Sequence, residues 1–199
     1  MIRSDRSSGT ISLFVGLATA FLVSSGLPQA AAGESGAVVG WGNDSSGRAT
    51  PPAAVDGSDG LANAIAAGGS HSCAIQDGTN AVVCWGANAA GQAAPPPGVD
   101  GSQGSASAIA AGGSHSCAIQ ASSGGVICWG SNSAGGVVVG QSTPPAAVDG
   151  SAGSATAIAT GASHSCAIQS GSGAVVCWGQ SSNGQATAPD AVNGTDGSA

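Results

Sequence analysis

The residues best suited to chemistry in this chain are six cysteines and three histidines, and they occur together. Each histidine stands two positions before a cysteine within the sequence HSCAIQ, and a second cysteine follows the first after eleven residues. Imidazole nitrogens and thiolates are zinc ligands, whereas two neighbouring thiols can also oxidise to a disulfide. The pattern therefore allows either a metal site or a covalent crosslink in each copy. The three pairs are Cys73 with Cys84, Cys117 with Cys128, and Cys166 with Cys177.

The surroundings of each cysteine pair favour the disulfide. In the first copy, two short β-prone runs flank a four-residue polar loop at 77–80, which is typical of a β-hairpin. We take Gln76 and Ala81 as the pair that closes this hairpin. Counting along both strands then places Cys73 opposite Cys84, at a Cα separation of about 4.5 Å. Zinc is the weaker alternative, because each hairpin offers only three ligands and His-x-Cys within a strand leaves little room to chelate.

The histidines His71, His115 and His164 could be ligands or acid–base residues, but they recur at one fixed position among recurring serines and glycines. This recurrence favours a framework role, such as a side-chain hydrogen bond inside the repeated unit. Four tryptophans are likewise interpreted as packing residues rather than as a sugar-stacking platform. They are Trp41, Trp85, Trp129 and Trp178.

The hairpins belong to a longer repeat. Each full unit has a small apolar strand, the hairpin, a segment related to Asn-x-x-Gly-Gln, a proline-containing stretch and a Val-Asp-Gly-like turn. The tryptophans are spaced by 44, 44 and 49 residues, and the five extra residues fall near 136–140, where we expect a longer loop or edge. Gly40 replaces cysteine in the first, incomplete unit, which lacks the HSCAIQ strand that would hold a partner cysteine. The units are a half repeat at 38–57, repeat 1 at 58–101, repeat 2 at 102–150, and repeat 3 with the tail at 151–199.

A period in the forties with about four short strands is the size of one β-propeller blade. The segments A-x-A-I-A-x-G-x-S-H-S-C-A-I, V-x-C-W-G-x-N and G-Q-x-x-x-P-P-x-x-V resemble the RCC1-type repeat of the regulator-of-chromosome-condensation family over residues 38–194. The resemblance implies an all-β fold, a partial or open β-propeller of RCC1-like four-stranded blades with about three and a half repeats. Because residues 192–199 cannot supply the strands that the half repeat lacks, we expect open edges capable of self-association.

The composition argues against several classes of partner. The chain has three arginines, no lysine and a formal charge of −7, so it lacks the cations that would neutralise the phosphates of nucleic acid or anionic lipid. Nuclear members of the family promote nucleotide exchange on a small GTPase and contact chromatin, and an acidic chain of this kind fits neither role. We expect no nucleic-acid partner and no membrane association of the mature form.

Residues 1–32 are interpreted as a secretory signal peptide. Arg3 and Arg6 precede an apolar stretch at 11–27, and the alanines at 30–32 fit a small-x-small cleavage site. An uncleaved membrane anchor is the alternative, although this stretch is short for a span of about 20 residues. Because disulfides persist in oxidising compartments, export suits the cysteines, and we expect a secreted, periplasmic or cell-surface protein.

The sequence contains no set of residues typical of catalysis, and we expect no enzyme activity, no cofactor and no metal site. Lysine and tyrosine are absent, and the many serines have no distinctive base beside them. Residues 56–60 resemble a calcium loop only faintly, because the counterparts at 100–104 and 149–153 lose the second acid and no bidentate glutamate follows. A turn is the better interpretation of these segments.

A repeated rigid frame with differing loops is typical of recognition proteins. We therefore expect an exported module that binds a protein or surface ligand through its variable loops at 77–80, 121–124, 136–140 and 170–173. The sequence does not identify the partner or its binding residues. The alternative is a structural or self-assembling cell-surface or extracellular protein without a discrete ligand site.

Overall fold

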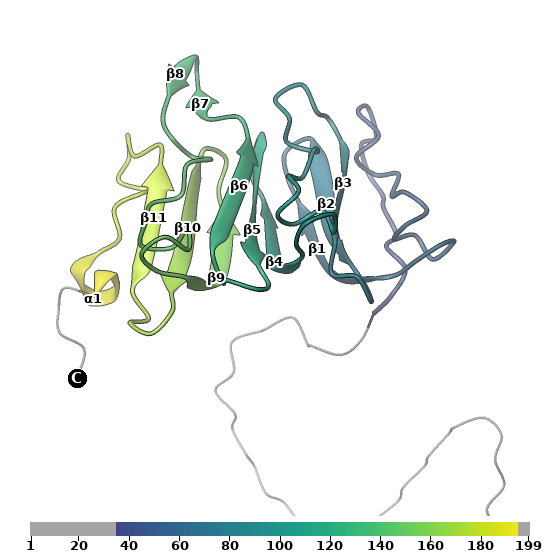
Figure 1. Ribbon diagram of the computed structural model, residues 1–199. Helices are drawn as coiled ribbons and strands as arrows, with labels where there is room; N and C mark the ends of the chain where they lie inside the picture. Colours follow the sequence, from purple (N-terminus) through teal and green to yellow (C-terminus); the bar gives the residue numbers. More distant parts are fainter. Residues whose placement is uncertain (1–34, 195–199) are drawn as a thin grey trace, which may run out of the picture.

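The computed structural model describes residues 35–194, so the predicted signal peptide at 1–32 lies outside the described residues, as do residues 195–199. The described part contains eleven strands and one short helix, α1 (Asp190–Asn193) (Figure 1). No helix in this part is both long and apolar enough to cross a membrane. The strands are β1 (Ala62–Ala67), β2 (His71–Gln76), β3 (Val82–Gly86), β4 (Ala106–Ala111), β5 (His115–Gln120), β6 (Val126–Gly130), β7 (Ser133–Ala134), β8 (Val137–Val138), β9 (Ala155–Thr160), β10 (His164–Gln169) and β11 (Val175–Gly179).

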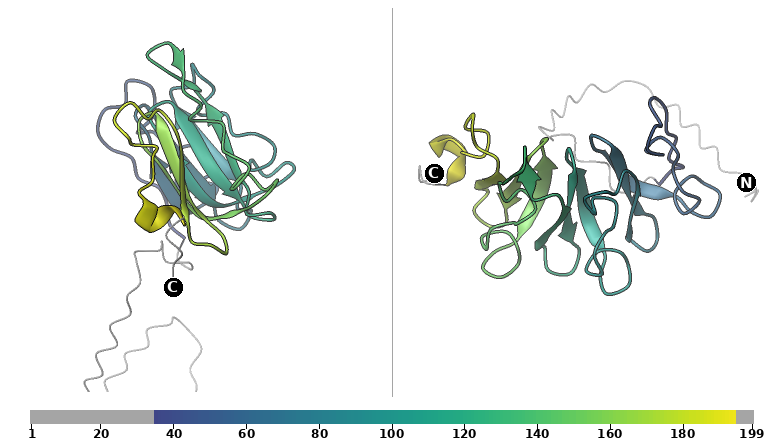
Figure 2. Two further views of the ribbon diagram at one scale, coloured as in Figure 1. Left: turned by 90° about the vertical axis from the view of Figure 1, so that its left-hand side faces the viewer. Right: turned by 90° about the horizontal axis from the view of Figure 1, so that it is seen from above.

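Nine of these strands form three antiparallel sheets, one for each full repeat. Blade 1 consists of β1, β2 and β3, blade 2 of β4, β5 and β6, and blade 3 of β9, β10 and β11, each with the HSCAIQ strand in the middle. The blades stand side by side in sequence order, and the view from above shows a row that does not close into a ring (Figures 1 and 2). The expected all-β, open propeller is confirmed.

The hairpins have the register expected from their loops. In blade 1, Cys73 lies opposite Cys84, and Ile75 lies opposite Val82. The last loop residue adopts a left-handed conformation in every copy, with φ of 55° at Asn80, 69° at Gly124 and 71° at Gly173. Asparagine and glycine tolerate this region better than other residues, which explains why one or the other ends each loop.

In blades 1 and 2, the fourth strand is reduced to a single backbone hydrogen bond. Val82 N donates to the carbonyl of Val99 at 2.9 Å, and Val126 N donates to Val148 at 2.8 Å. Both acceptor valines are fully buried, so the segment is still part of the core. Proline-rich stretches at 95–97 and 144–145 precede them, and because proline has no N–H it cannot continue a strand ladder. The expected four-stranded blade is therefore a sheet of three strands, with one backbone hydrogen bond in place of the fourth strand in blades 1 and 2.

The hydrophobic core lies between blades rather than inside one. One cluster joins Cys73, Ile75 and Val82 of blade 1 to Ala118 and Trp129 of blade 2. A second cluster repeats this arrangement between blades 2 and 3. Each blade therefore depends on its neighbour to keep its apolar side chains from water.

The half repeat and the insertion are the two departures from this pattern. Gly36 forms an isolated bridge with Ala62, and Val38 N donates to Val55 O at 2.9 Å, so residues 36–57 lie against blade 1 without forming a strand of a sheet. The residues near 136–140 form the small β7–β8 hairpin, which projects beyond the ends of the long strands (Figure 1). The longer loop expected there is thus a hairpin.

Candidate functional site

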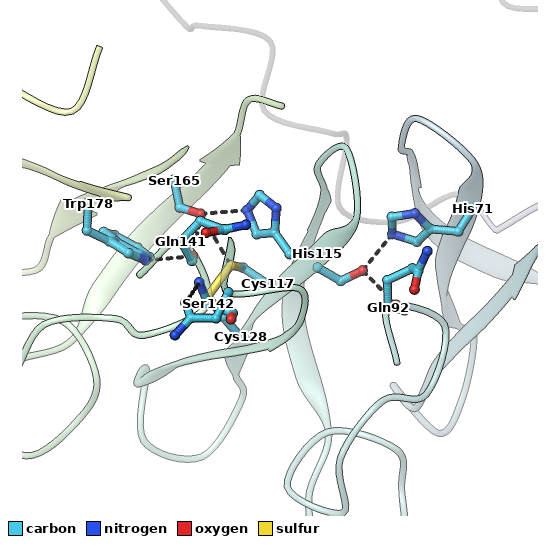
Figure 3. The surroundings of a disulfide bond; sticks show 11 residues. His71, Gln92, His115, Cys117, Cys128, Gln141, Ser142, Ser165 and Trp178 are labelled. Atoms are coloured by element: carbon cyan, nitrogen blue, oxygen red, sulfur yellow. Dashed lines mark hydrogen bonds between the residues drawn. A yellow bond between two sulfur atoms is a disulfide. The ribbon is translucent and has the colours of Figure 1, made fainter. Parts of the chain in front are cut away.

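The repeated histidine forms a buried hydrogen bond to the next blade. His71 Nε2 lies 2.8 Å from Ser116 Oγ, and His115 Nε2 lies 2.9 Å from Ser165 Oγ (Figure 3). All four side chains are fully buried. The sequence predicted a hydrogen bond inside one repeat, and this detail was wrong, because the packed faces of two blades bring the histidine of one against the serine of the next. The framework role itself is supported.

The hydrogen bonds of the serines define the protonation of the histidines. Ser116 Oγ donates its proton to the carbonyl of Gln92 at 3.0 Å, so it can only accept from His71 Nε2. His71 Nδ1 is then unprotonated, and it has no hydrogen-bond partner among the described residues. The serine therefore does not give its proton to the histidine, which is the opposite of what a serine nucleophile requires.

Burial keeps these imidazoles neutral. It lowers the pKa of His71 below its usual range and lowers the pKa of His115 to about 4, with His71 and His164 acting in the same direction. The glycine before the histidine makes room for the ring, since a Cβ on Gly68 would lie 2.6 Å from His71 Cε1. The pair holds adjacent blades together and offers no acid–base group at neutral pH.

Three tryptophans complete the same contact. Trp129 Nε1 donates to the Gln92 carbonyl at 2.9 Å, so this oxygen accepts from both Ser116 and Trp129. Trp178 does the same with Gln141, at 3.0 Å. The packing role predicted for the tryptophans is supported for Trp85, Trp129 and Trp178. The prediction was wrong for Trp41, which is 85% exposed.

The position of Trp41 has a simple cause. It belongs to the half repeat, and no blade precedes the half repeat among the described residues, whereas Trp129 and Trp178 pack against the blade before them. With Val38, Val39, Ala64 and Ile65 it lines an apolar groove of about 400 Å³.

The six cysteines form the three disulfides expected from the sequence. The bonds join Cys73 to Cys84, Cys117 to Cys128 and Cys166 to Cys177, with Cα separations of 4.0, 4.1 and 4.0 Å. Their sulfurs are therefore not available as thiolate ligands for zinc. Residues 35–194 contain no group of three or more histidine, cysteine, aspartate or glutamate side chains that could hold a metal ion.

The segments that faintly resembled calcium loops are turns. Asp100 Oδ1 accepts hydrogen bonds from the backbone N and the hydroxyl of Ser102, at 2.8 and 2.6 Å, and Asp149 does the same with Ser151. These hydrogen bonds lower the pKa of both aspartates. The carboxylates therefore close their own turns.

Two kinds of surface remain as candidates for recognition. The loops at 77–80, 121–124 and 170–173 lie at one end of the blades, and the β7–β8 hairpin lies at the other (Figure 1). The hairpin is the most apolar of them, with Val137 65% exposed and Val138 73% exposed. The other candidates are the two outer faces of the row of blades.

The comparisons agree with this architecture. Residues 63–92, 106–135 and 155–185 each match the regulator of chromosome condensation (RCC1) repeat. The chain carries three RCC1 repeats. No protein of known function matches the chain significantly in sequence.

Two solved structures are similar to this chain. The ectodomain of the receptor kinase CR4 from Physcomitrella patens has 28% identity and a TM-score of 0.53, over 70% of this chain and 35% of CR4. Prp20p from Saccharomyces cerevisiae, which binds Gsp1p and histones, has 21% identity and a TM-score of 0.50, over 69% of this chain and 36% of Prp20p. The chain thus spans about a third of these structures.

The sequence contained a signal for the contact between blades that its interpretation missed. Each tryptophan follows the residue whose carbonyl it binds by 37 positions, and each serine follows the same residue by 24. These residues are Arg48, Gln92 and Gln141. Because the bond uses a backbone oxygen, the type of side chain gave no indication of it.

Proposed function

We propose that the mature chain is an exported RCC1-type module that binds a protein partner through its loops, with the β7–β8 hairpin as the principal contact. The observation that carries this proposal is the exposure of Val137 and Val138, 65% and 73%, at the tip of a projecting hairpin. Repeats 1 and 3 lack this insertion. Apolar side chains grouped on a surface mark contacts with other macromolecules.

The hairpin is held in place by the frame beneath it. Gln141 is almost fully buried, and its Nε2 donates to the Ser133 carbonyl at 3.0 Å. Asn132 donates from Nδ2 to Thr143 Oγ1 and accepts from Ser142 N, both at 3.0 Å. A binding element that is already ordered loses less conformational entropy when it meets its partner.

The disulfides and the similarity to a receptor ectodomain favour recognition outside the cell. The three disulfides and the similarity to the CR4 ectodomain are consistent with an extracellular location. The partners of Prp20p are not carried over, because the described residues of this chain include one cation, Arg48, with which to bind nucleosomal or acidic surfaces. We infer a binding protein rather than an enzyme, since the recurring histidine–serine pairs are buried and serve the contact between blades.

A pull-down with matched variants tests this proposal. Purified mature protein is immobilised and exposed to the exported proteins of its source, and retained proteins are identified by mass spectrometry. The V137E/V138E variant adds two charges to the hairpin tip, and A121E/S122E adds two charges to the exposed β5–β6 loop at the other end of the same blade. We expect one heterologous partner to be retained by the wild type and by A121E/S122E but lost with V137E/V138E. Retention of no heterologous protein, or equal retention by all three, would overturn the proposal.

A further inference from the structure

The contact between blades has two different sides. The preceding blade contributes a histidine, an isoleucine and two valines, represented in blade 1 by His71, Ile75, Val82 and Val99. The following blade contributes alanines, an isoleucine, a serine and a tryptophan, represented in blade 2 by Ala106, Ala118, Ile109, Ser116 and Trp129. Each contact between blades therefore joins one side to the other and never two copies of the same side.

Blade 3 presents the first side without a cover among the described residues. We call this the C-terminal face and define it by His164, Ile168, Val175 and Val192. Ile168 is 36% exposed and Val192 is 43% exposed. The isoleucines at the same position in blades 1 and 2 are each 2% exposed, and the three equivalent valines are completely buried; these residues are Ile75, Ile119, Val55, Val99 and Val148.

Blade 1 presents the second side with an incomplete cover. We call this the N-terminal face and define it by Ile65, Ser72 and Trp85. Ile65 is 58% exposed, and Ser72 and Trp85 are half-buried, although the equivalent serines and tryptophans of blades 2 and 3 are buried. The half repeat covers this face only in part, through its bridge to Ala62 and the packing of Val38.

The end of blade 3 carries a counterpart of the carbonyl through which the half repeat binds Ser72 and Trp85. Ser72 Oγ and Trp85 Nε1 both donate to the carbonyl of Arg48, at 3.0 and 2.9 Å. The counterpart of Arg48 in repeat 3 is Gln185, seven residues after its tryptophan in both cases. Exchange would therefore keep both hydrogen bonds.

The exchange would also add contacts that the half repeat lacks. The half repeat has no counterpart of β9 and β10, so it offers no histidine to Ser72 and no isoleucine above Ile65. Blade 3 supplies His164 and Ile168 in these places. The exchange therefore buries Ile65 and Ile168, which are otherwise exposed, and keeps the hydrogen bonds of Ser72 and Trp85. It releases Val55, whose buried place Val192 takes, and it breaks the hydrogen bonds that Gly36 N and the Arg48 side chain donate to blade 1.

We propose that the C-terminal face of one copy docks on the N-terminal face of a second copy, in place of residues 36–57. The docked faces reproduce the contact that already joins blades 1, 2 and 3. Two copies joined at both ends form a ring of six blades, which lies within the range of four to eight that propellers use. The surface is separate from the β7–β8 hairpin, so this inference does not depend on the proposed function.

Sedimentation analysis over a range of concentrations tests the docking, with two variants that each alter one face. I65E changes the N-terminal face and leaves the C-terminal face intact, while I168E does the reverse. Both side chains are exposed, so the fold is retained, which the melting curve and the three disulfides verify; V192E is a second variant of the C-terminal face. V137E/V138E is the matched control at the hairpin.

We expect the wild type and V137E/V138E to form dimers, and each face variant to lose at least about tenfold in its association constant. An equimolar mixture of I65E and I168E should recover a dimer, because one intact face remains on each partner. A wild type that is monomeric at every concentration would overturn the proposal. So would a mixture that stays monomeric, or association that I65E abolishes and both I168E and V192E leave unchanged.

Discussion

Each histidine buried between two blades has one ring nitrogen satisfied and the other without a partner. Nε2 of His115 donates to Ser165, while Nδ1 has no hydrogen-bond partner among the described residues. A proton added to Nδ1 would create a buried charge with no acceptor beside it. The contact between blades is therefore built for a neutral imidazole, and acid should weaken it.

The neutral imidazole of His115 should make the stability of the fold depend on pH. Burial lowers the pKa of His115 from 6.5 to about 4. As the pH falls below 6.5, the imidazole of the unfolded chain binds a proton that the folded chain excludes. The free energy of unfolding is therefore highest above pH 6.5 and decreases as the pH falls to about 4. The loss from this one group is about 3 kcal/mol. Urea unfolding between pH 7 and 4 should show it.

The matched variant for this prediction is H115Q, whose amide nitrogen can still donate to Ser165 but does not titrate. In H115Q, the free energy of unfolding should depend much less on pH than in the wild type. H164Q, at the same repeat position on the C-terminal face, controls for the replacement itself. If the free energy of unfolding of H115Q changed with pH as steeply as that of the wild type, the imidazole of His115 would not be the cause of the effect.

The sequence indicated the role of these residues but not their partners. Repetition of His71, His115 and His164 favoured a framework role over catalysis, and the buried contacts support it. The identity of the acceptor could not be predicted, because it lies on a strand 45 to 50 residues away, in another sheet. A repeat sequence specifies each unit well and says little about how one unit rotates against the next.

At the scale of the elements, the three hairpins are alike in sequence but not in exposure. Cys73 and Cys117 are completely buried, and their sulfurs lie 3.7 and 3.6 Å from a serine hydroxyl of the next blade. Cys166 is only half-buried, because no blade follows blade 3 among the described residues. The blade that follows therefore protects the first two disulfides from one side.

This difference predicts an order of reduction. An attacking thiolate must reach a sulfur atom, so Cys166–Cys177 should be reduced before the other two disulfides under mild reductant. The measurement is brief reduction of folded protein, alkylation and peptide mass spectrometry. I65E is the suitable background, since it keeps the C-terminal face uncovered. Equal labelling of all six cysteines at every time point would contradict the expectation.

The hairpins were the most predictable elements, and the outer strand was the least. The four-residue loop and the pairing of Gln76 with Ala81 were enough to place Cys73 opposite Cys84, because a side-chain period of two leaves little freedom in the register. The fourth strand of the blade was expected from the family resemblance. Its replacement by a single backbone hydrogen bond could have been inferred from Pro95–Pro97, which interrupt the ladder of backbone donors.

At the scale of the whole molecule, the row of blades has two unlike ends. The sequence predicted open edges from the count of repeats, but it did not predict which residues the edges expose. Trp41 and Ile65 are exposed at one end because the covering strands are missing, and Ile168 is exposed at the other for the same reason. Residues of identical type are buried or exposed according to their place in the row alone.

Small-angle X-ray scattering of the I65E/I168E double variant is the decisive test of whether the three blades form an open row. Both faces are altered in this variant, so it should be monomeric and report the shape of one chain. We expect the scattering of an open, three-bladed arc. Scattering from a monomeric, closed ring of four blades, with the half repeat completing the fourth, would contradict it.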